Sequence, residues 1–142
     1  MTRILVCGLP GSGKTTFTAD LARTLNHTHT VVKINADEVR KFYNDWDFSP
    51  KGRRRQAQRM VDIANDVYSA VDVVILDFVC PLEELRDLVQ ADIIIWADTL
   101  QESRFEDTNA IFENPIKYDY RFRAYKDSYV IISDIKQLLE EQ

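Results

Sequence analysis

Residues 8–15 read Gly-Leu-Pro-Gly-Ser-Gly-Lys-Thr, which fits the pattern G-x-x-x-x-G-K-[ST] of a phosphate-binding loop. The apolar stretch Arg3–Cys7 just before it predicts a short buried strand. Residues Lys14–Leu25 carry apolar side chains at intervals of four, which predicts a helix with one buried face. A strand, a glycine-rich loop and a helix in this order indicate a site for the phosphates of a nucleotide.

The residue types in this loop suit phosphate binding for physical reasons. Glycines allow backbone N–H groups to turn inward without Cβ clashes, and the next helix aims its positive end at the same phosphates. We expect Lys14 to reach the β- and γ-phosphates of ATP and the Thr15 hydroxyl to bind Mg²⁺. A chance glycine-rich turn is the alternative, and the flanking strand and helix argue against it. The expected nucleotide contacts are Gly8, Gly11, Ser12, Gly13, Lys14, Thr15 and Thr16.

Outward from this loop, segments that suit strands alternate with segments that suit helices. The expected strands are Arg3–Cys7, Val31–Ile34, Val71–Leu76, Asp92–Ala97 and Tyr129–Ile132. The expected helices are Lys14–Leu25, Asp37–Phe42, Arg53–Ser69, Leu82–Val89 and Asp134–Glu141, the last with Ser133 as its N-cap. Residues Thr99–Tyr125 should be mostly irregular or short-helical. This alternation predicts an α/β fold with a five-stranded, mainly parallel sheet, helices on both faces, and ligands at the carboxyl ends of the strands.

Length and charge narrow the class of protein. A chain of 142 residues predicts a single domain over residues 1–142, with no room for an ATPase motor. Its 18 basic and 23 acidic residues give a net charge of −5, which argues against binding nucleic acid through bulk charge. No apolar run is long enough to cross a bilayer, and the sequence lacks the Asn-Lys-x-Asp motif that reads guanine. A small kinase that uses ATP fits these limits best.

Carboxylate and guanidinium groups follow the second expected strand, which ends in Asn35-Ala36-Asp37-Glu38-Val39-Arg40. Asp37 could accept a proton from a substrate hydroxyl, and Arg40, one helical turn further on, could hold a substrate anion. The alternative is that Asp37 only caps a short helix and that Arg40 is solvated. Because a phosphate loop stands nearby, we expect Lys14, Asp37 and Arg40 to be the catalytic residues.

One segment of this acidic chain is strongly basic. Phe48-Ser49-Pro50 is followed by Arg53, Arg54, Arg55 and Arg59. The arginine fork suits bidentate recognition of phosphate or sulfate, although runs of charge are usually solvated helix faces. We expect Arg53 and Arg59 to bind an anion and the other two arginines to lie mostly on the surface.

These segments together resemble the adenylylsulfate kinase family. Residues 35–40 are similar to the D-G-D-x-x-R motif of that family, Asp47–Pro50 and the arginines after it to an F-S-x-x-x-R segment, and Phe78–Pro81 with Arg86 to an F-I-S-P segment. The order and the spacing agree from the phosphate loop to about residue 98. The resemblance implies a kinase that transfers the γ-phosphate of ATP to the 3′-hydroxyl of adenosine 5′-phosphosulfate.

The resemblance also implies a role for each matching residue. Asp37 becomes the base or a metal-associated carboxylate, and the arginines hold the phosphosulfate group. Phe48 stacks on the adenine of the acceptor, and Phe112 is the second aromatic of that clamp. The implied substrate contacts are Asp37, Arg40, Phe48, Arg53, Arg59 and Phe112.

Two departures from the family pattern fall at strand ends. This chain has Asn35 where the family has the first Asp of D-G-D, and it has Asp77 where the family usually has a small residue. Asp77 follows the apolar run Val73–Leu76, a place where a carboxylate can hold Mg²⁺ directly or through water. We predict that Thr15 and Asp77 are the metal-side residues, with Asp77 in place of the missing aspartate. The alternative is that Asp77 only caps a turn.

Other departures leave two further functions open. Gln58 replaces the first arginine of an R-R pair, and the D-P-K-G-L-Y lid segment of the family is missing. The chain could phosphorylate another hydroxyl, on a polynucleotide 5′-end, a modified nucleotide or a small metabolite, or it could bind a nucleotide without transferring phosphate. Arg104 could reach the transferred phosphate or lie on the surface.

The expected setting and partners follow from the same observations. Cys7 and Cys80 form no disulfide framework, so a reducing, cytoplasmic setting is expected. The cofactors are ATP and Mg²⁺, and the acceptor is a small molecule, under the resemblance itself a nucleotide. No membrane partner is expected, nucleic acid is disfavoured by the net charge, and a homodimer stays open.

Overall fold

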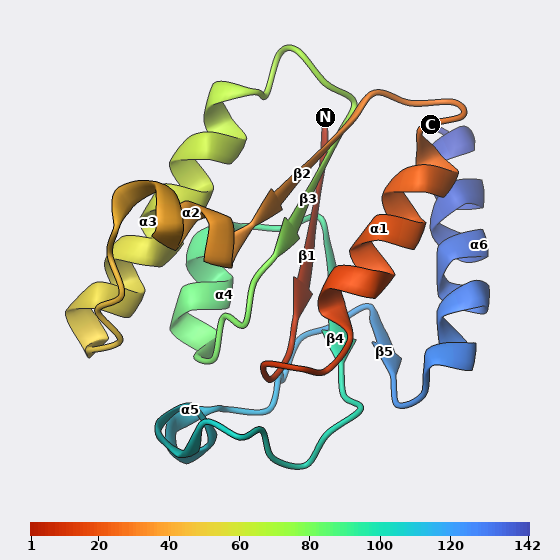
Figure 1. Ribbon diagram of the computed structural model, residues 1–142. Helices are drawn as coiled ribbons and strands as arrows, with labels where there is room; N and C mark the ends of the chain where they lie inside the picture. Colours follow the sequence, from red (N-terminus) through yellow and green to blue (C-terminus); the bar gives the residue numbers. More distant parts are fainter.

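The computed structural model describes all residues from Met1 to Gln142. A five-stranded sheet in the order β2-β3-β1-β4-β5 forms its centre, and every neighbouring pair of strands is parallel (Figure 1). The strands are β1 (Thr2–Cys7), β2 (Val31–Asn35), β3 (Val73–Asp77), β4 (Ile93–Ala97) and β5 (Tyr120–Phe122). The predicted five-stranded α/β fold is confirmed, and the phosphate loop follows the central strand β1.

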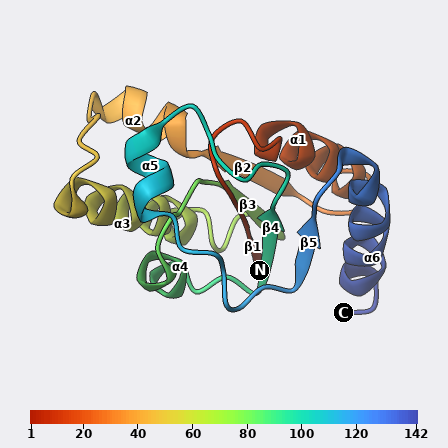
Figure 2. The same cartoon turned by 90° about the horizontal axis from the view of Figure 1, so that it is seen from below.

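Helices cover both faces of the sheet, as the sequence predicts. They are α1 (Lys14–Leu25), α2 (Ala36–Tyr43), α3 (Pro50–Asp66), α4 (Glu83–Val89), α5 (Glu106–Ile111) and α6 (Ser128–Glu140), with a 3₁₀ turn at Tyr125–Asp127. Helices α1 and α6 pack on one face, and α3 and α4 pack on the other (Figure 1). Viewed from the carboxyl ends of the strands, α5 lies on the side of α2 and α3 (Figure 2).

Both faces of the central strand are buried, which explains its unbroken apolar sequence. Ile4 and Val6 face the α1–α6 layer, whereas Leu5 and Cys7 face the α3–α4 layer. Cys7 and Cys80 are free, buried thiols, and burial raises the pKa of Cys7 to about 11. Neither cysteine is therefore a reactive thiolate at neutral pH.

The expected strand Tyr129–Ile132 is wrong, because these residues belong to α6. Ile131, Ile132, Ile135 and Leu139 recur at helical spacing and pack on α1 and the sheet. Tyr129 and Val130 point to solvent, with 66% and 67% of their surface exposed. Since the helix already starts at Ser128, Ser133 lies in its interior and is not an N-cap. The run of β-branched residues favoured a strand, and the packing against α1 decided for a helix.

The fifth strand lies in the segment that was expected to be mostly irregular. Strand β5 has three residues and pairs with β4 in the register Ile95↔Tyr120 to Ala97↔Phe122. Phe122 is buried and stacks on Phe17 of α1, with 4.9 Å between the ring centroids. This single aromatic anchor fixes a strand too short to leave a periodic pattern in the sequence.

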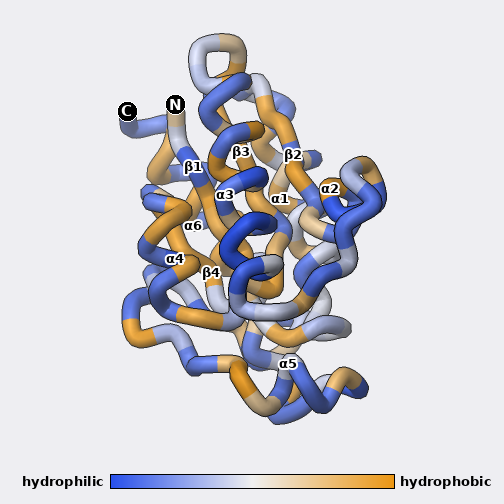
Figure 3. Tube along the Cα trace, turned by 90° about the vertical axis from the view of Figure 1, so that its left-hand side faces the viewer, coloured by the Kyte–Doolittle hydropathy of each residue, from blue (hydrophilic) through white to orange (hydrophobic).

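The expected helix Asp134–Glu141 is the second half of α6, and the remaining expected elements are present with ends that differ by no more than three residues. Helix α3 begins earlier than expected, because the Ser49 hydroxyl accepts from the Gly52 N–H and Pro50 takes the first helical position. The outward side of α3 is largely hydrophilic (Figure 3). None of the helices is long and apolar enough to cross a membrane.

Candidate nucleotide and acceptor site

A cavity of about 1030 Å³ opens at the carboxyl ends of the central strands. The phosphate loop and the start of α1 line one side, and α2 with the start of α3 lines the other. The segment that leads into α5, together with α5 itself, supplies further lining residues. A cavity at this edge of a parallel sheet is where such folds bind ligands.

The phosphate loop passes close to the backbone of β4. A Cβ at Gly8 would lie 2.4 Å from the carbonyl oxygen of Ala97, so no other residue fits at this position. The Thr99 hydroxyl donates to the Ser12 carbonyl at 2.8 Å and ties the loop to the segment after β4. The loop therefore has a fixed shape next to the N-terminus of α1.

Lys14 is folded back onto the phosphate loop. Its Nζ donates to the carbonyl oxygen of Leu9 at 2.9 Å, and its side chain is buried. Burial lowers the pKa of Lys14, while the carboxylates of Asp77 and Asp37 act in the opposite direction. The ammonium group therefore lies between the loop and two carboxylates, where a phosphate would be attracted to it.

Asp77 faces the phosphate loop, as the sequence predicts. Its Oδ2 accepts from the Thr15 hydroxyl at 2.8 Å and from the Asn35 amide Nδ2 at 3.0 Å. Its Oδ1 has no hydrogen-bond partner and is not sealed from solvent, and Asp77 lines the cavity. Hydroxyl and carboxylate oxygens are ligands that Mg²⁺ prefers, so the two side chains fit that ion.

Asp37 lies in the first turn of α2 with a free side chain. The helix is capped by Asn35, whose Oδ1 accepts from the Glu38 N–H at 3.0 Å, so capping is not the role of Asp37. The Asp37 carboxylate makes no hydrogen bond within the protein, and it lines the cavity. It is therefore available to a substrate hydroxyl.

Arg40 is buried and is not a solvated surface residue. Its Nη1 donates to the carbonyl oxygens of Asp45 and Asp47, at 3.0 and 3.3 Å. Its guanidinium carbon lies 4.3 Å from the centre of the Phe48 ring, and burial lowers its pKa. Nε and Nη2 of Arg40 have no partner in the protein.

Arg53 approaches the same ring from α3. Its Nε donates to the Phe48 carbonyl at 2.9 Å, and its Nη2 donates to the Thr108 hydroxyl at 3.4 Å. The Asp107 carboxylate oxygen Oδ2 lies 3.9 Å from Nη2 of Arg53, and the guanidinium carbon of Arg53 is 5.2 Å from the Phe48 ring centre. The structure thus brings Arg40, Phe48 and Arg53 together in one cavity.

Arg59 does not line this cavity, contrary to the expected substrate contact. Its Nη1 binds Asp45 at 2.7 Å, and its guanidinium stacks on the Tyr43 ring at 4.1 Å. Arg55, expected to lie mostly on the surface, also binds both Asp45 and Asp47. Arg55 and Arg59 hold the pKa of Asp45 below its usual range. These two arginines therefore brace the loop from Asp45 to Asp47, outside the ligand site.

The backbone of this loop also lies unusually close to α3. A Cβ at Gly52 would come within 2.1 Å of the carbonyl oxygen of Asp47, so only glycine lets the loop pack there. Gly52 is thus a positioning residue that the sequence patterns missed, although it is the only glycine outside the phosphate loop. It allows the backbone at Asp47, the residue before Phe48, to pack against the first turn of the helix.

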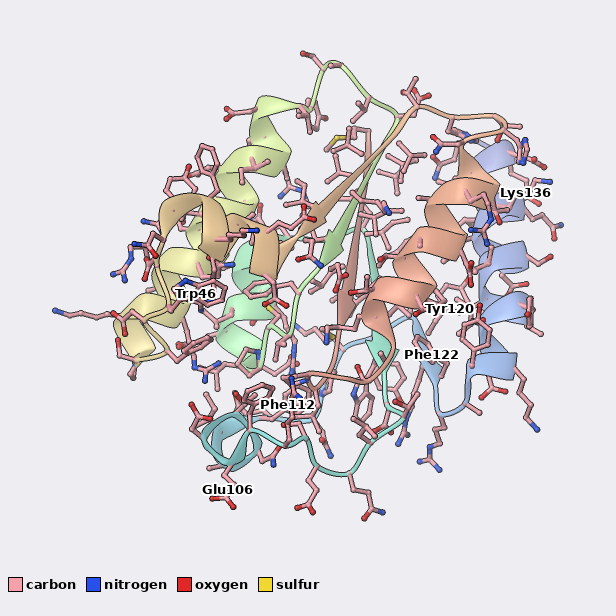
Figure 4. All side chains as sticks on the ribbon, in the orientation of Figure 1. Trp46, Glu106, Phe112, Tyr120, Phe122 and Lys136 are labelled. Atoms are coloured by element: carbon pink, nitrogen blue, oxygen red, sulfur yellow. The ribbon has the colours of Figure 1, made fainter.

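Phe112 does not face Phe48, so the expected aromatic clamp is wrong in its second member. Phe112 follows α5, lies 5.2 Å from the Arg86 guanidinium, and lines a separate cavity of about 520 Å³. Figure 4 shows Phe112 beside α5, apart from Trp46 near α2 and α3. Phe105, at the other end of α5, lines the main cavity with Phe48 and Trp46. The short helix α5 separates the two rings and decides which one reaches the site.

The segment before α5 and the first turn of α5 add charge that the motifs do not cover. Arg104 is exposed, and it also lines the main cavity, where its guanidinium carbon lies 5.0 Å from the centre of the Phe105 ring. Asp107 also lines it, next to Arg53. Neither residue lies in a motif: the sequence left the place of Arg104 open, and only the course of the chain between β4 and β5 reveals Asp107.

Comparisons with known proteins agree with this geometry. The model of the adenylylsulphate kinase family matches residues 1–104, and no curated protein sequence matches significantly. The solved APS kinase CysC of Mycobacterium tuberculosis in complex with AMPPNP and APS is 19% identical, with a TM-score of 0.82 over 98% of this chain and 97% of that one. A cysteine-to-alanine mutant of the same enzyme is 21% identical, with a TM-score of 0.78 over 98% and 96%.

The fold is shared with kinases for other acceptors. Shikimate kinase from Aquifex aeolicus is 22% identical, with a TM-score of 0.62 over 99% of this chain and 97% of that one. At such low sequence identities, these solved structures support the fold alone. The family assignment rests on the family model, which matches most of the chain. It confirms the resemblance that the motifs of the sequence carry. The chain therefore belongs to the adenylylsulphate kinase family of P-loop kinases and is a nucleotide-dependent phosphotransferase.

Proposed function

We propose that this protein transfers the γ-phosphate of ATP to the 3′-hydroxyl of adenosine 5′-phosphosulfate, within a single kinase domain of residues 1–142. One observation carries the choice of acceptor: two buried guanidinium groups with free N–H groups flank an aromatic ring in the cavity of the phosphate loop. An acceptor with a planar base and an anionic group would match this arrangement. The similar enzyme of M. tuberculosis was solved with APS.

The free donors support an anionic acceptor. Arg40 and Arg53 are only 5% and 6% exposed, and each already donates to backbone carbonyls. Nε and Nη2 of Arg40 and Nη1 of Arg53 have no partner in the protein, yet they are not sealed from solvent. Pre-oriented arginine N–H groups favour phosphate and sulfate oxygens strongly, so the phosphosulfate would bind here.

Aromatic rings supply the other half of the acceptor site. Phe48, Phe105 and Trp46 line the cavity, and each keeps about half of its surface exposed. Exposed rings in a cavity wall are suited to stacking on a nucleobase. We assign the adenine of the acceptor to the space between Phe48 and Phe105.

Lys14 would bind the phosphates of ATP at the opposite wall. On binding, its ammonium would exchange the Leu9 carbonyl for the β- and γ-phosphates, over the N–H groups of the loop. Thr15 and the free Oδ1 of Asp77 would hold Mg²⁺, which supplies positive charge against the phosphates when bound. ATP bound in this way would direct its γ-phosphate toward Asp37 on α2.

Asp37 would serve as the base. The 3′-hydroxyl oxygen attacks the γ-phosphorus, the bond to the β-phosphate oxygen breaks, and the hydroxyl proton passes to the Asp37 carboxylate. The products are ADP and the 3′-phosphorylated acceptor. The unpartnered Asp37 side chain, in the wall between Lys14 and Arg40, supports this assignment.

A different hydroxyl acceptor is the second candidate, and Asp107 favours it. Its carboxylate lies 3.9 Å from the Arg53 guanidinium, so it competes with an acceptor anion for that arginine. An acceptor with a smaller charge would leave this ion pair in place.

Labelled ATP and a panel of acceptors separate the two candidates. The panel holds adenosine 5′-phosphosulfate, adenosine 5′-phosphate, a 5′-hydroxyl oligonucleotide, shikimate and gluconate. We expect label transfer to adenosine 5′-phosphosulfate above all others, and loss of transfer in Lys14→Ala. Faster labelling of another acceptor would establish the second candidate, and labelling of none would contradict both.

A further inference from the structure

Asn35 connects the phosphate-loop side of the cavity with the helix on the acceptor side. It ends β2 directly beside Asp77, the last residue of β3, since the two are register partners. The Asn35 amide nitrogen donates to Asp77 Oδ2 at 3.0 Å, and its amide oxygen accepts from the Glu38 N–H at 3.0 Å. One planar side chain thus binds the carboxylate and caps α2 at the same time.

We propose that Asn35 is a positioning residue that aims the Asp77 carboxylate at the cation site and fixes that site to α2. This inference rests on the proposed cation role of Asp77. The Thr15 hydroxyl and the Asn35 amide both donate to Oδ2, which holds the carboxylate plane and leaves Oδ1 facing the cavity. Without the amide, one donor would remain, and the carboxylate could turn about its Cβ–Cγ bond.

The chemistry of position 35 requires an amide. Asp77 is only 5% exposed, so a second carboxylate against Oδ2 would either repel it or bind a proton, and in both cases the negative charge offered to a cation would not be that of a fixed Asp77 carboxylate. A hydroxyl residue could still cap α2 but offers no N–H at the distance of Asp77. Asparagine is the short side chain that donates in one direction and accepts in the other.

The connection has a functional consequence. Asp37 and Arg40 lie on α2, whose first turn the Asn35 oxygen holds. Asn35 is therefore a direct link between the proposed cation site and the first turn of the helix that carries the base and the acceptor arginine. Partners that orient a metal ligand are commonly worth ten- to a hundredfold in metal affinity.

Asn35→Ser separates the two functions of the amide. Serine is a favoured N-cap, so α2 stays capped, while the donor to Asp77 is lost. We would measure Mn²⁺ binding to the full chain with ADP by electron paramagnetic resonance. We expect Mn²⁺ affinity to fall about ten- to a hundredfold, with the metal-free affinity for ADP and the melting temperature nearly unchanged. Asn26→Ser, at the exposed end of α1, is the matched control and should change neither.

A double-mutant cycle with Asp77→Asn tests whether Asn35 acts through Asp77. In that background, Asn35→Ser should cause little further loss of Mn²⁺ affinity, because the residue that it orients has lost its charge. Asn35→Thr, with another favoured N-cap residue, should reproduce the effect of Asn35→Ser.

Three outcomes would overturn the inference: unchanged Mn²⁺ affinity in Asn35→Ser, equal losses with and without the Asp77 carboxylate, or no Mn²⁺ binding by the wild-type ADP complex. The assay contains no acceptor, so it is independent of the acceptor panel. If the variants show the expected losses of Mn²⁺ affinity but the wild-type protein does not phosphorylate adenosine 5′-phosphosulfate, this inference stands and the proposed acceptor is contradicted.

Discussion

The Thr15 hydroxyl donates a hydrogen bond to Asp77 Oδ2 at 2.8 Å, across 62 positions of sequence. The first residue lies in the opening turn of α1 and the second at the end of β3, so the contact joins the phosphate loop to its neighbouring strand. It excludes the alternative that Asp77 merely caps the turn after its strand. The contact places the Asp77 carboxylate beside Asn35, its register partner, which is the geometry that the predicted exchange of carboxylates between these two strand ends requires.

The first prediction concerns this exchange of carboxylates. Asp77→Ala should sharply raise the Mg²⁺ concentration needed for half-maximal activity, because Thr15 would be left as the only proposed protein ligand. Asn35→Asp should partly rescue that variant, since it returns a carboxylate to the adjacent strand end. A Mg²⁺ titration of activity and of nucleotide binding measures both. Asp66→Ala, at the exposed end of α3, is the control and should leave the Mg²⁺ requirement unchanged. An unchanged Mg²⁺ requirement in Asp77→Ala would contradict the exchange of carboxylates.

A second prediction tests the phosphate loop. Lys14→Ala should weaken ATP binding and lower turnover by at least about a hundredfold, because it removes the charge that bridges the transferred phosphate. Lys41→Ala, on the exposed side of α2, should leave both unchanged. Titration of ATP and steady-state kinetics supply the measurements. Wild-type turnover in Lys14→Ala would contradict the role of the loop.

The third prediction concerns the base. Asp37→Asn keeps the shape of the side chain and the Asn35 cap of α2, so ATP affinity should stay near its wild-type value. Turnover should fall by about two to four orders of magnitude, the usual contribution of a general base. If the turnover number is unchanged, the role passes to another carboxylate in the cavity, with Asp77 the first to test.

The positions of Asp77, Lys14 and Asp37 could be predicted from the sequence. Each of these residues lies at the end of a strand or in the motif that directly follows it. The ends of β1, β2 and β3 are register neighbours, so a motif at each end places its side chains at one edge of the sheet. The same logic predicted the meeting of Thr15 with Asp77. Local pattern and sheet topology together were sufficient here.

The sequence failed where long-range packing or a short helix decides. The β-branched run Tyr129–Ile132 by itself favours a strand, and its partners on α1, which decide for a helix, are more than a hundred residues away. Arg59 matched a motif by spacing, yet its guanidinium binds Asp45 and lies outside the cavity. Such outcomes depend on which partner is nearest in space, and linear spacing does not contain that information.

The fourth prediction separates the two motif arginines. Arg53→Ala should raise the KM for the acceptor about ten- to a hundredfold, because it removes a charged donor from the cavity. Arg59→Ala should leave that KM nearly unchanged and lower the melting temperature slightly, since it loosens the loop that Asp45 anchors. Steady-state kinetics with each substrate varied in turn, together with thermal unfolding, decide between them. A larger KM effect from Arg59→Ala would restore it to the ligand site.

The last prediction concerns the aromatic clamp, for which the sequence and the structure name different residues. Phe105 lines the main cavity, whereas Phe112 packs near Arg86, whose Nη2 donates to the Glu113 carbonyl at 2.6 Å. Phe105→Ala should raise the KM for the acceptor by about tenfold, the contribution of one stacked base, and leave the KM for ATP unchanged. Phe112→Ala should leave both KM values unchanged and lower the melting temperature, because the ring packs between α5 and the buried Arg86. The two variants remove the same atoms from opposite ends of one short helix, so each serves as the control for the other. The reverse pattern, with a raised acceptor KM only in Phe112→Ala, would show that the motif alignment is correct and that α5 turns over when the acceptor binds.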